Sequence, residues 1–439
     1  MTTSIKGPFD GRKWAFFGAA LALLLAAANL RGGLVVVGPL VADIRAGLSL
    51  SASEFSLLTT LPLICFSLVS ICVPRLARLV RAPVLVTGAL LLIAAGAGLR
   101  ATSFYSLMLA GTLLLGSAIA LLNVLIPGLV KGYFPRQAGL MTGLYSVTLS
   151  LGAGLGVFLA VPLRDAFSAW QAPVLLWALL PLICALCWLG MLRIRSREMA
   201  PGTAGRISLW RDARAWNLTV FMGLQSLFFY SIATWLPKIL MDAGLEDQQA
   251  GLATSMINLA GIPANLMVPI IAARMQDQRP LVLLVLVLGV TGLTGLWLNP
   301  TAAPLFWASL LGLSGSASLS LALALFALRT RSGLEATSLS AMAQSLGYLL
   351  AAAGPVVVGG LNDLQGSWGS ALLLLIAAQV IQFGCGWHAS RPGFVTPDQQ
   401  RGQGAPGASE PRPHCCDCSA VAQALSRFRL SNSDFLTNT

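Results

Sequence analysis

One arginine lies deep inside an apolar stretch of this chain. Arg31 falls in the run Trp14–Leu40, within the polar-and-glycine segment Ala28–Gly33. A continuous helix over this run would be about 40 Å long, enough to cross the roughly 30 Å core of a bilayer. A guanidinium in that core costs about 2.5–3.5 kcal/mol and normally faces a helix-bundle interior or a watery cavity. We therefore expect Arg31 to face a cavity whose contents favour a fixed positive charge.

Other polar and aromatic side chains recur inside apolar runs at helical spacing. Gln344 and Tyr348 share a face with Ser340, and Gln225 shares a face with Trp235. Such amides could line a path for a solute or could equally bond neighbouring helices. The candidate solute-binding residues are Arg31, Asn123, Tyr145, Gln225, Trp235, Gln344, Tyr348, Asn29 and Asn258.

Asn29 differs from the other candidates in helical phase. It is two residues from Arg31, about 200° around a helix, so the two side chains cannot face one cavity. We expect Arg31 to face the cavity, and Asn29, with Gly32 and Gly33, to form a contact between helices.

Groups suited to catalysis or proton transfer are missing from the predicted membrane interior. The acidic residues nearest to apolar runs all fall at their ends or in loops: Asp43, Glu54, Asp165, Asp242, Glu246, Asp247, Glu335 and Asp363. No nucleophile–base pair, metal cluster or nucleotide-binding Gly-rich loop is present at membrane depth, so the sequence predicts neither an enzyme nor a bound cofactor or metal. Energy for any transport must then come from gradients.

Composition places the chain among helical membrane proteins. Of 439 residues, 56% are hydrophobic and only 10% are charged, and the mean hydropathy is +0.78. The net charge of +12 could suggest a nucleic-acid partner. The basic residues, however, fall in short gaps between apolar runs, where they set topology in a lipid bilayer.

A hydropathy window of about 19 residues predicts twelve membrane spans. They lie near residues 14–40, 54–73, 83–99, 105–130, 138–162, 172–192, 216–236, 249–272, 280–298, 303–328, 336–360 and 368–388. With the amino terminus in the cytoplasm, 23 of 28 basic residues lie on the inner side and only Arg45, Arg100, Arg164 and Lys238 lie outside. This bias predicts that both termini are cytoplasmic.

A weak internal repeat divides the chain into two halves. Ser56–Thr60 resembles Gly251–Ser255, 195 residues later, and Leu144–Ser146 falls against Ala343–Ser345, 199 residues later. The predicted fold is an all-α membrane protein with twelve helices in two pseudo-symmetric six-helix bundles. Its parts are a cytoplasmic amino terminus (1–13), two bundles (14–192 and 216–388), a cytoplasmic linker (193–215) and a disordered cytoplasmic tail (389–439).

Four stretches resemble a known family. They are Asn29–Arg31, Leu58–Pro62, Gln225–Pro237 and Met342–Tyr348, and they resemble the cyanate and 2-nitroimidazole transporter branch of the major facilitator superfamily. The resemblance covers roughly residues 14–388 and implies alternating access, in which two six-helix halves rock around a central site.

From these observations we expect a monomeric multi-pass transporter of the bacterial inner membrane that moves a small anionic or polar solute. A drug or nitroaromatic exporter that relies on aromatic faces is the alternative within transport. A channel or a membrane-embedded enzyme is the alternative from another class. A channel would lack the repeat, and an enzyme needs a catalytic group at membrane depth.

Overall fold

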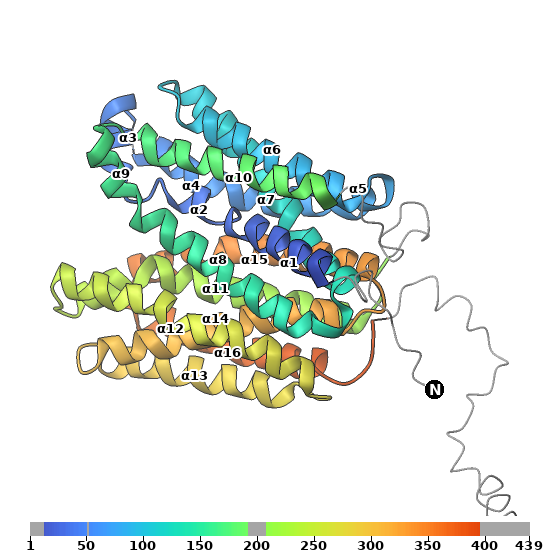
Figure 1. The fold of residues 1–439 in the computed structure, drawn as a ribbon. Helices are drawn as coiled ribbons and strands as arrows, with labels where there is room; N and C mark the ends of the chain where they lie inside the picture. Colours follow the sequence, from blue (N-terminus) through green and yellow to red (C-terminus); the bar gives the residue numbers. More distant parts are fainter. Residues whose placement is uncertain (1–12, 51, 192–207, 396–439) are drawn as a thin grey trace, which may run out of the picture. The chain divides into compact units, whose positions relative to one another are not determined.

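The computed structural model describes residues 13–50, 52–191 and 208–395, and within these ranges the chain forms helices and turns but no strands (Figure 1). The amino-terminal half contains α1 (Lys13–Ala28), α2 (Gly32–Val35), α3 (Val41–Leu48), α4 (Ala52–Ser70), α5 (Val73–Leu79), α6 (Ala82–Arg100), α7 (Tyr105–Tyr133), the short helix η1 (Pro135–Gln137), α8 (Ala138–Phe158), α9 (Ala160–Phe167) and α10 (Gln171–Met191). The carboxy-terminal half contains α11 (Ala213–Asp242), α12 (Asp247–Arg274), α13 (Arg279–Leu298), α14 (Pro304–Leu328), α15 (Gly333–Gln365) and α16 (Gly369–Ala389).

The number of membrane-spanning helices agrees with the prediction. In the described ranges, 11 helices are long and apolar enough to cross a bilayer, or up to 12 when one bent pair counts as a span. That pair corresponds to the second predicted span, where the axis turns by 54° between Thr60–Ser70 and Val73–Leu79.

The first span is not the continuous helix that the sequence suggested. Helix α1 ends at Ala28, residues Asn29–Arg31 form a turn, and α2 resumes for four residues from Gly32. Arg31 is the residue that precedes α2 and has non-helical backbone angles (φ −122°, ψ −35°). The apolar pattern hid this break, because a hydropathy average does not register glycines that loosen a helix.

Helix contacts repeat between the two halves. In the amino-terminal half α1 packs on α8, α4 on α7, α6 on α7 and α6 on α10. The equivalent helices of the other half make the same pairs: α11 with α15, α12 with α14, α13 with α14 and α13 with α16. All of these helices belong to one unit of the chain, Met1–Asp398. The structure therefore has two pseudo-symmetric six-helix halves, as predicted.

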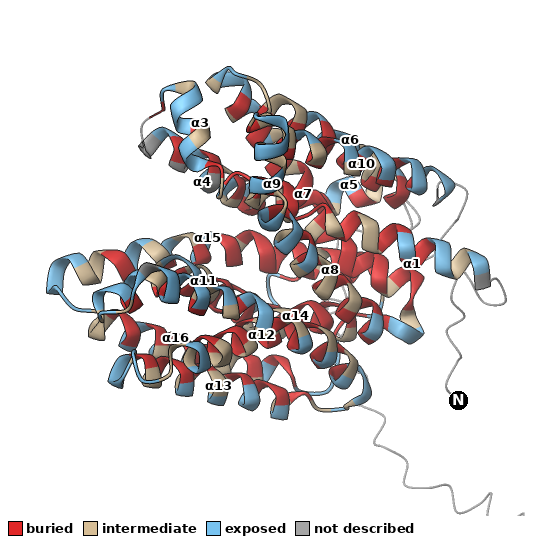
Figure 2. Ribbon diagram, turned by 60° about the vertical axis from the view of Figure 1, so that its left-hand side comes forward, coloured by how far each residue is buried: buried red, intermediate tan, exposed pale blue. Residues whose placement is uncertain are grey.

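Six helices form most of the contact between the halves. Helix α4 packs on α15 and α8 packs on α12, a pair of contacts that the repeat relates to each other, while α7 also packs on α15 and α14 contacts α8 and α7. The apolar windows of α7 and α14 are both 78% buried, compared with 39% for α13. Figure 2 shows these buried stretches where the halves meet, and the outer helices carry the exposed faces.

The halves touch most closely at the end of the bundle where α1 begins and α16 ends, which we call the terminal end. There Gly128 of α7 packs against Thr337 and Gly333 of α15, and a Cβ at Gly128 would lie 2.6 Å from the Gly333 carbonyl oxygen. Gly139 of α8 would similarly place a Cβ 2.5 Å from the carbonyl oxygen of Pro269 in α12. Glycine at these positions lets the helix backbones approach this closely.

This contact does not continue along the full length of the helices. Asn258 and Asn265 are seven residues apart and therefore share one face of α12. Asn265 is buried and donates its Nδ2 to Ser150 Oγ of α8 at 3.0 Å, whereas Asn258 is exposed. The amino-terminal half thus covers this face of α12 only toward the terminal end.

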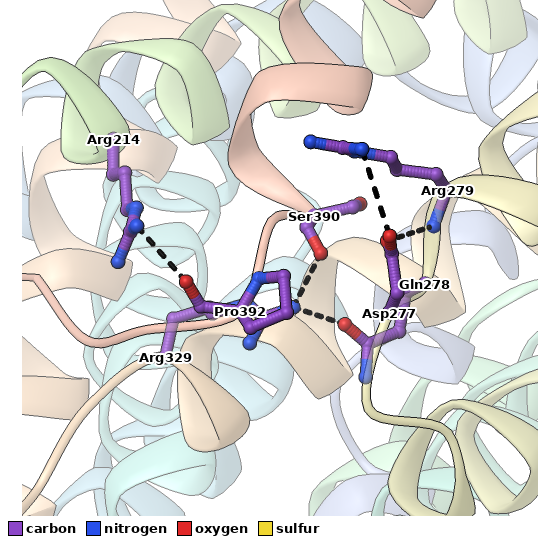
Figure 3. A network of polar contacts seen from close by, with 7 residues as sticks. All are labelled: Arg214, Asp277, Gln278, Arg279, Arg329, Ser390 and Pro392. Carbon is purple, nitrogen blue, oxygen red and sulfur yellow. Dashed lines mark hydrogen bonds and ion pairs between the residues drawn. The ribbon is translucent and has the colours of Figure 1, made fainter. Parts of the chain in front are cut away.

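A polar network closes the terminal end of the carboxy-terminal half (Figure 3). Arg329 is 6% exposed and donates to Gln278 Oε1 and, at 2.6 Å, to the carbonyl oxygen of Ser390. Burial, together with the nearby Arg214 cation, lowers the pKa of Arg329 to about 10, so the guanidinium remains charged at neutral pH. The network joins the α12–α13 turn, the α14–α15 turn and the end of α16.

The first residues after α16 are also bound to this end. Arg214 donates to the carbonyl oxygens of Pro392 at 3.0 Å and Phe394 at 3.1 Å, and the Val395 amide donates to the Arg329 carbonyl at 2.8 Å. Residues 1–12, residue 192, most of the predicted linker (193–207) and the rest of the predicted tail (396–439) lie outside the described residues.

Candidate functional site

A small cavity lies between the two halves, near the middle of the spans. Its volume is about 20 Å³, enough for about one water molecule. It is lined by Arg31, Asn123, Tyr145, Leu149, Met222, Leu319, Leu323, Gln344 and Tyr348. Five of the nine candidates from the sequence are therefore brought together here from four segments: the break before α2, α7, α8 and α15.

The Arg31 guanidinium is the charged group of this cavity. The break between α1 and α2 removes Arg31 from regular helix and places it at the start of α2. Within the described ranges this side chain has no hydrogen bond or ion pair, and its guanidinium carbon lies 5.8 Å from the centre of the Phe229 ring. A partly buried cation without a counter-charge is suited to binding an anion.

An amide frame surrounds the polar side of the cavity. Gln344 of α15 donates its Nε2 to the Asn123 carbonyl oxygen at 2.9 Å and to Ser340 Oγ at 2.8 Å. Tyr145 donates its hydroxyl to Asn123 Oδ1 at 3.4 Å. Gln344 belongs to the carboxy-terminal half and Asn123 to the amino-terminal half, so this frame crosses the interface.

Aromatic and aliphatic groups make up the rest of the lining. The Tyr348 ring packs against Phe66 of α4 with centroids 5.1 Å apart, and Leu149, Met222 and Leu323 add apolar surface. A charged group, a few directed polar atoms and rings together resemble the usual lining of a small-molecule site.

The remaining candidates lie elsewhere. Asn29 is buried against α10 and donates its Nδ2 to Cys184 Sγ at 3.1 Å. Trp235 donates its Nε1 to the Pro355 carbonyl oxygen at 2.8 Å and stacks near Trp368. Asn258 is exposed, as described above.

Gln225 is buried within the carboxy-terminal half. Its Nε2 is 3.5 Å from the Gly315 carbonyl oxygen, and its Oε1 accepts a hydrogen bond from Ser226 Oγ at 3.0 Å. Gln225 therefore bonds neighbouring groups of its own half, which is the second of the two interpretations that the sequence allowed.

Two relevant residues were not identified from the sequence. Phe229 faces Arg31, but it lies outside the face that Gln225 and Trp235 share and was not singled out. Asn265 makes the bond to Ser150 across the interface, whereas Asn258, two turns earlier, was named instead. The sequence does show that α12 carries two asparagines on one face. It does not show where along α12 the two halves separate.

Metal-binding geometry is not found in the part of the chain that the structure describes, where no three His, Cys, Asp or Glu side chains gather. The segment His414–Cys418, which holds a histidine and three cysteines within the predicted tail, lies outside that part.

Comparison with known proteins identifies the architecture and the relatives. Residues 15–355 match the Major Facilitator Superfamily. The chain is 37% identical over 365 residues to the 2-nitroimidazole transporter of Escherichia coli (strain K12), covering 81% of this chain and 92% of that protein. It is 32% identical over 355 residues to the cyanate transport protein CynX of the same organism, covering 79% and 91%. Its fold is similar to FucP in the outward conformation, with a TM-score of 0.70 at 15% identity, covering 87% of this chain and 99% of that one.

Proposed function

Because this chain belongs to the Major Facilitator Superfamily, we propose that it carries a small anionic or polar solute across the membrane by alternating access, with Arg31 as the charge anchor. The observation that carries this proposal is the unpaired Arg31 guanidinium at the cavity between the halves. A solute anion would supply the counter-charge that the described residues do not provide.

The amide frame around the cavity also favours a solute that has polar atoms of its own. Gln344 and Asn123 come from opposite halves and are already hydrogen bonded, so a solute with its own polar atoms would compete for these groups. Tyr145 and Tyr348 offer ring faces to a flat solute. A small linear or flat anion, such as cyanate, a small carboxylate or an azolate, offers a negative charge and polar atoms to these groups, and two relatives are named for 2-nitroimidazole and cyanate.

The closed terminal end supports alternating access. Glycine contacts hold α7 to α15 and α8 to α12 there, while the exposed Asn258 marks where the contact ends. With cytoplasmic termini, as the basic residues predict, this arrangement is the state closed toward the cytoplasm. The protein would then act as a monomer in the bacterial inner membrane and use a gradient as its energy source.

The experiment is uptake into proteoliposomes by wild type, Arg31→Gln and Arg31→Lys. The solutes are cyanate, small carboxylates and neutral azoles at two imposed pH gradients, and Arg391→Gln, at an exposed position outside the spans, is the matched control. We expect saturable anion uptake that responds to the gradient, is lost in Arg31→Gln and is partly kept in Arg31→Lys. Equal anion uptake by wild type and Arg31→Gln would refute the anchor.

Export of a nitroaromatic or drug-like solute is the second candidate. The rings of Tyr145, Tyr348 and Phe229 near the cavity favour it, as does the similarity to a 2-nitroimidazole transporter. In that case Arg31→Gln should spare transport of neutral 2-nitroimidazole in the same vesicles, while substitution of Tyr348 by alanine should reduce it.

A further inference from the structure

A second arginine of the amino-terminal half has an unusual environment. Arg100 is the last residue of α6 and is 0% exposed. The sequence assigned it to an outer loop, where a basic residue needs no partner. Its burial is therefore a finding that hydropathy and charge counts did not anticipate.

The guanidinium of Arg100 is bonded through one nitrogen only. Its Nη1 donates to the carbonyl oxygen of Gly33, while Nε and Nη2 are buried without a hydrogen-bond partner. Arg100 also makes no ion pair within the described ranges. Taking a charge out of water without a partner costs several kcal/mol even after relaxation, and an apolar side chain at such a site is often the more stable choice. Stability alone does not account for Arg100.

The bonded carbonyl belongs to the interrupted first span. Gly33 lies in α2, two residues after Arg31, and α2 ends at Val35. The last carbonyls of a helix have no donors within the helix, and side chains, water or tighter turns can bond them instead. Arg100 is such a donor. The carbonyl group that it binds lies two residues after Arg31, the proposed charge anchor.

Two other helices complete the surroundings of this break. The Trp177 ring of α10 lies directly over Gly32, and a Cβ at Gly156 of α8 would lie 2.8 Å from the Gly32 carbonyl oxygen. These contacts restrict the break sterically. The hydrogen bond from Arg100 also fixes the orientation of the Gly33 carbonyl group.

We propose that Arg100 is a positioning residue that holds the Asn29–Arg31 interruption and so presents the Arg31 guanidinium to the cavity. This inference rests on the proposed function where it concerns solute binding, and on the geometry of the first span alone where it concerns the break. Arg100 itself does not line the cavity.

The test compares Arg100→Gln and Arg100→Lys with a matched control, Trp188→Phe. Trp188 is also buried and donates its Nε1 to a first-span carbonyl, that of Ala22, at 2.8 Å, but this bond lies nine residues before Arg31. Anion uptake gives KM and maximal rate for each folded variant. Fluorine NMR of protein labelled with 5-fluorotryptophan reports on Trp177 at the break, and its signal is assigned with Trp177→Phe.

We expect Arg100→Gln to raise KM for the anion about tenfold or more, as small misplacements of a binding group can. Maximal rate should change less, Arg100→Lys should restore part of the affinity, and the Trp177 resonance should shift. Trp188→Phe should lower thermal stability without changing KM or that resonance. An unchanged KM and resonance in folded Arg100→Gln, or the same KM change in Trp188→Phe, would overturn the proposal.

The result also separates the two proposals. If Arg31→Gln leaves anion uptake intact, the charge anchor is wrong whatever Arg100 does. A shifted Trp177 resonance in Arg100→Gln would still show that Arg100 stabilises the break between α1 and α2. An unshifted resonance would reject this role of Arg100 as well.

Discussion

The Arg31 guanidinium carbon lies 5.8 Å from the centre of the Phe229 ring, so a cation of the amino-terminal half faces an aromatic ring of the carboxy-terminal half. Such a pair is worth about 0.5–2 kcal/mol, depending on how far it is removed from water. It is one of the contacts at the cavity that join the two halves, together with the Gln344–Asn123 hydrogen bond.

Replacing Phe229 by leucine should therefore weaken anion binding by about 2- to 30-fold, because Arg31 loses the ring that orients it. Phe229→Tyr should retain most of the affinity, since it keeps the ring. KM for uptake measures the effect. Phe306→Leu on the exposed surface of α14 is the control and should match wild type. An unchanged KM in Phe229→Leu would show that the ring does not orient the cation.

Gln344→Glu should strongly reduce anion uptake, because it places a carboxylate in the same cavity as Arg31. The side chain keeps its length, but it supplies the counter-charge that the solute would otherwise bring and it faces the Asn123 carbonyl oxygen as a second acceptor. We expect a loss of at least tenfold, as two like charges compete for one cation. Gln344→Leu, which removes the hydrogen bonds but adds no charge, should be milder. If Gln344→Leu is as inactive as Gln344→Glu, charge is not the cause.

Gly128→Ala should favour the state in which the terminal end is open. The added Cβ would collide with Thr337 and lie 2.6 Å from the backbone oxygen of Gly333, so α7 and α15 must separate. Spin-label distances between these two helix ends should lengthen, and Thr337→Ala should partly reverse the change. Gly154→Ala, where a Cβ meets open space, is the control. Unchanged distances would mean that the contact is not part of the gate.

Asn258 and Asn265 give a direct test of where the halves separate. In a background without native cysteines, Asn258→Cys should react readily with a polar maleimide and Asn265→Cys should react slowly, because only the second position is buried. Saturating solute should slow labelling at position 258 if transport closes that end. Labelling that is equal at the two positions would contradict the arrangement described here.

Gln278→Leu should destabilise the protein by about 1.5–3 kcal/mol, the contribution of a hydrogen bond to a charged group, because it leaves buried Arg329 without that acceptor. The additional change Arg329→Met should recover part of the loss by removing the stranded cation. Thermal unfolding, followed with a dye that reacts with buried thiols such as Cys65 and Cys184, measures both effects. Arg391→Gln should have little effect, and a double variant less stable than Gln278→Leu would contradict this account.

Much of the fold could be predicted from the sequence. Long apolar runs separated by short basic gaps determine membrane helices, because both follow from local transfer free energies that each segment carries by itself. The number of spans and the all-helical class were obtained in this way, the division into two halves came from the internal repeat, and all three are confirmed. Where a prediction depended on a continuous helix, as for Trp14–Leu40, it was wrong, because packing against Trp177 and Gly156 stabilises a break that hydropathy does not see.

The candidate site was only partly accessible to the same reasoning. Polar type and helical phase named Arg31, Gln344 and Tyr348, which line one cavity. They also named Trp235 and Asn258, which do not line this cavity. Helical phase shows which residues share a face of one helix, but it does not show which other helix packs against that face.

The sequence by itself therefore determined the helices, their number, and a charge placed at membrane depth. Only the tertiary structure decided that Arg31 lacks a partner, that Phe229 faces it, and that Arg100 is buried beside the break in its helix. The physical reason is that burial and pairing arise between segments far apart in the chain, whereas hydropathy and periodicity are properties of a single segment.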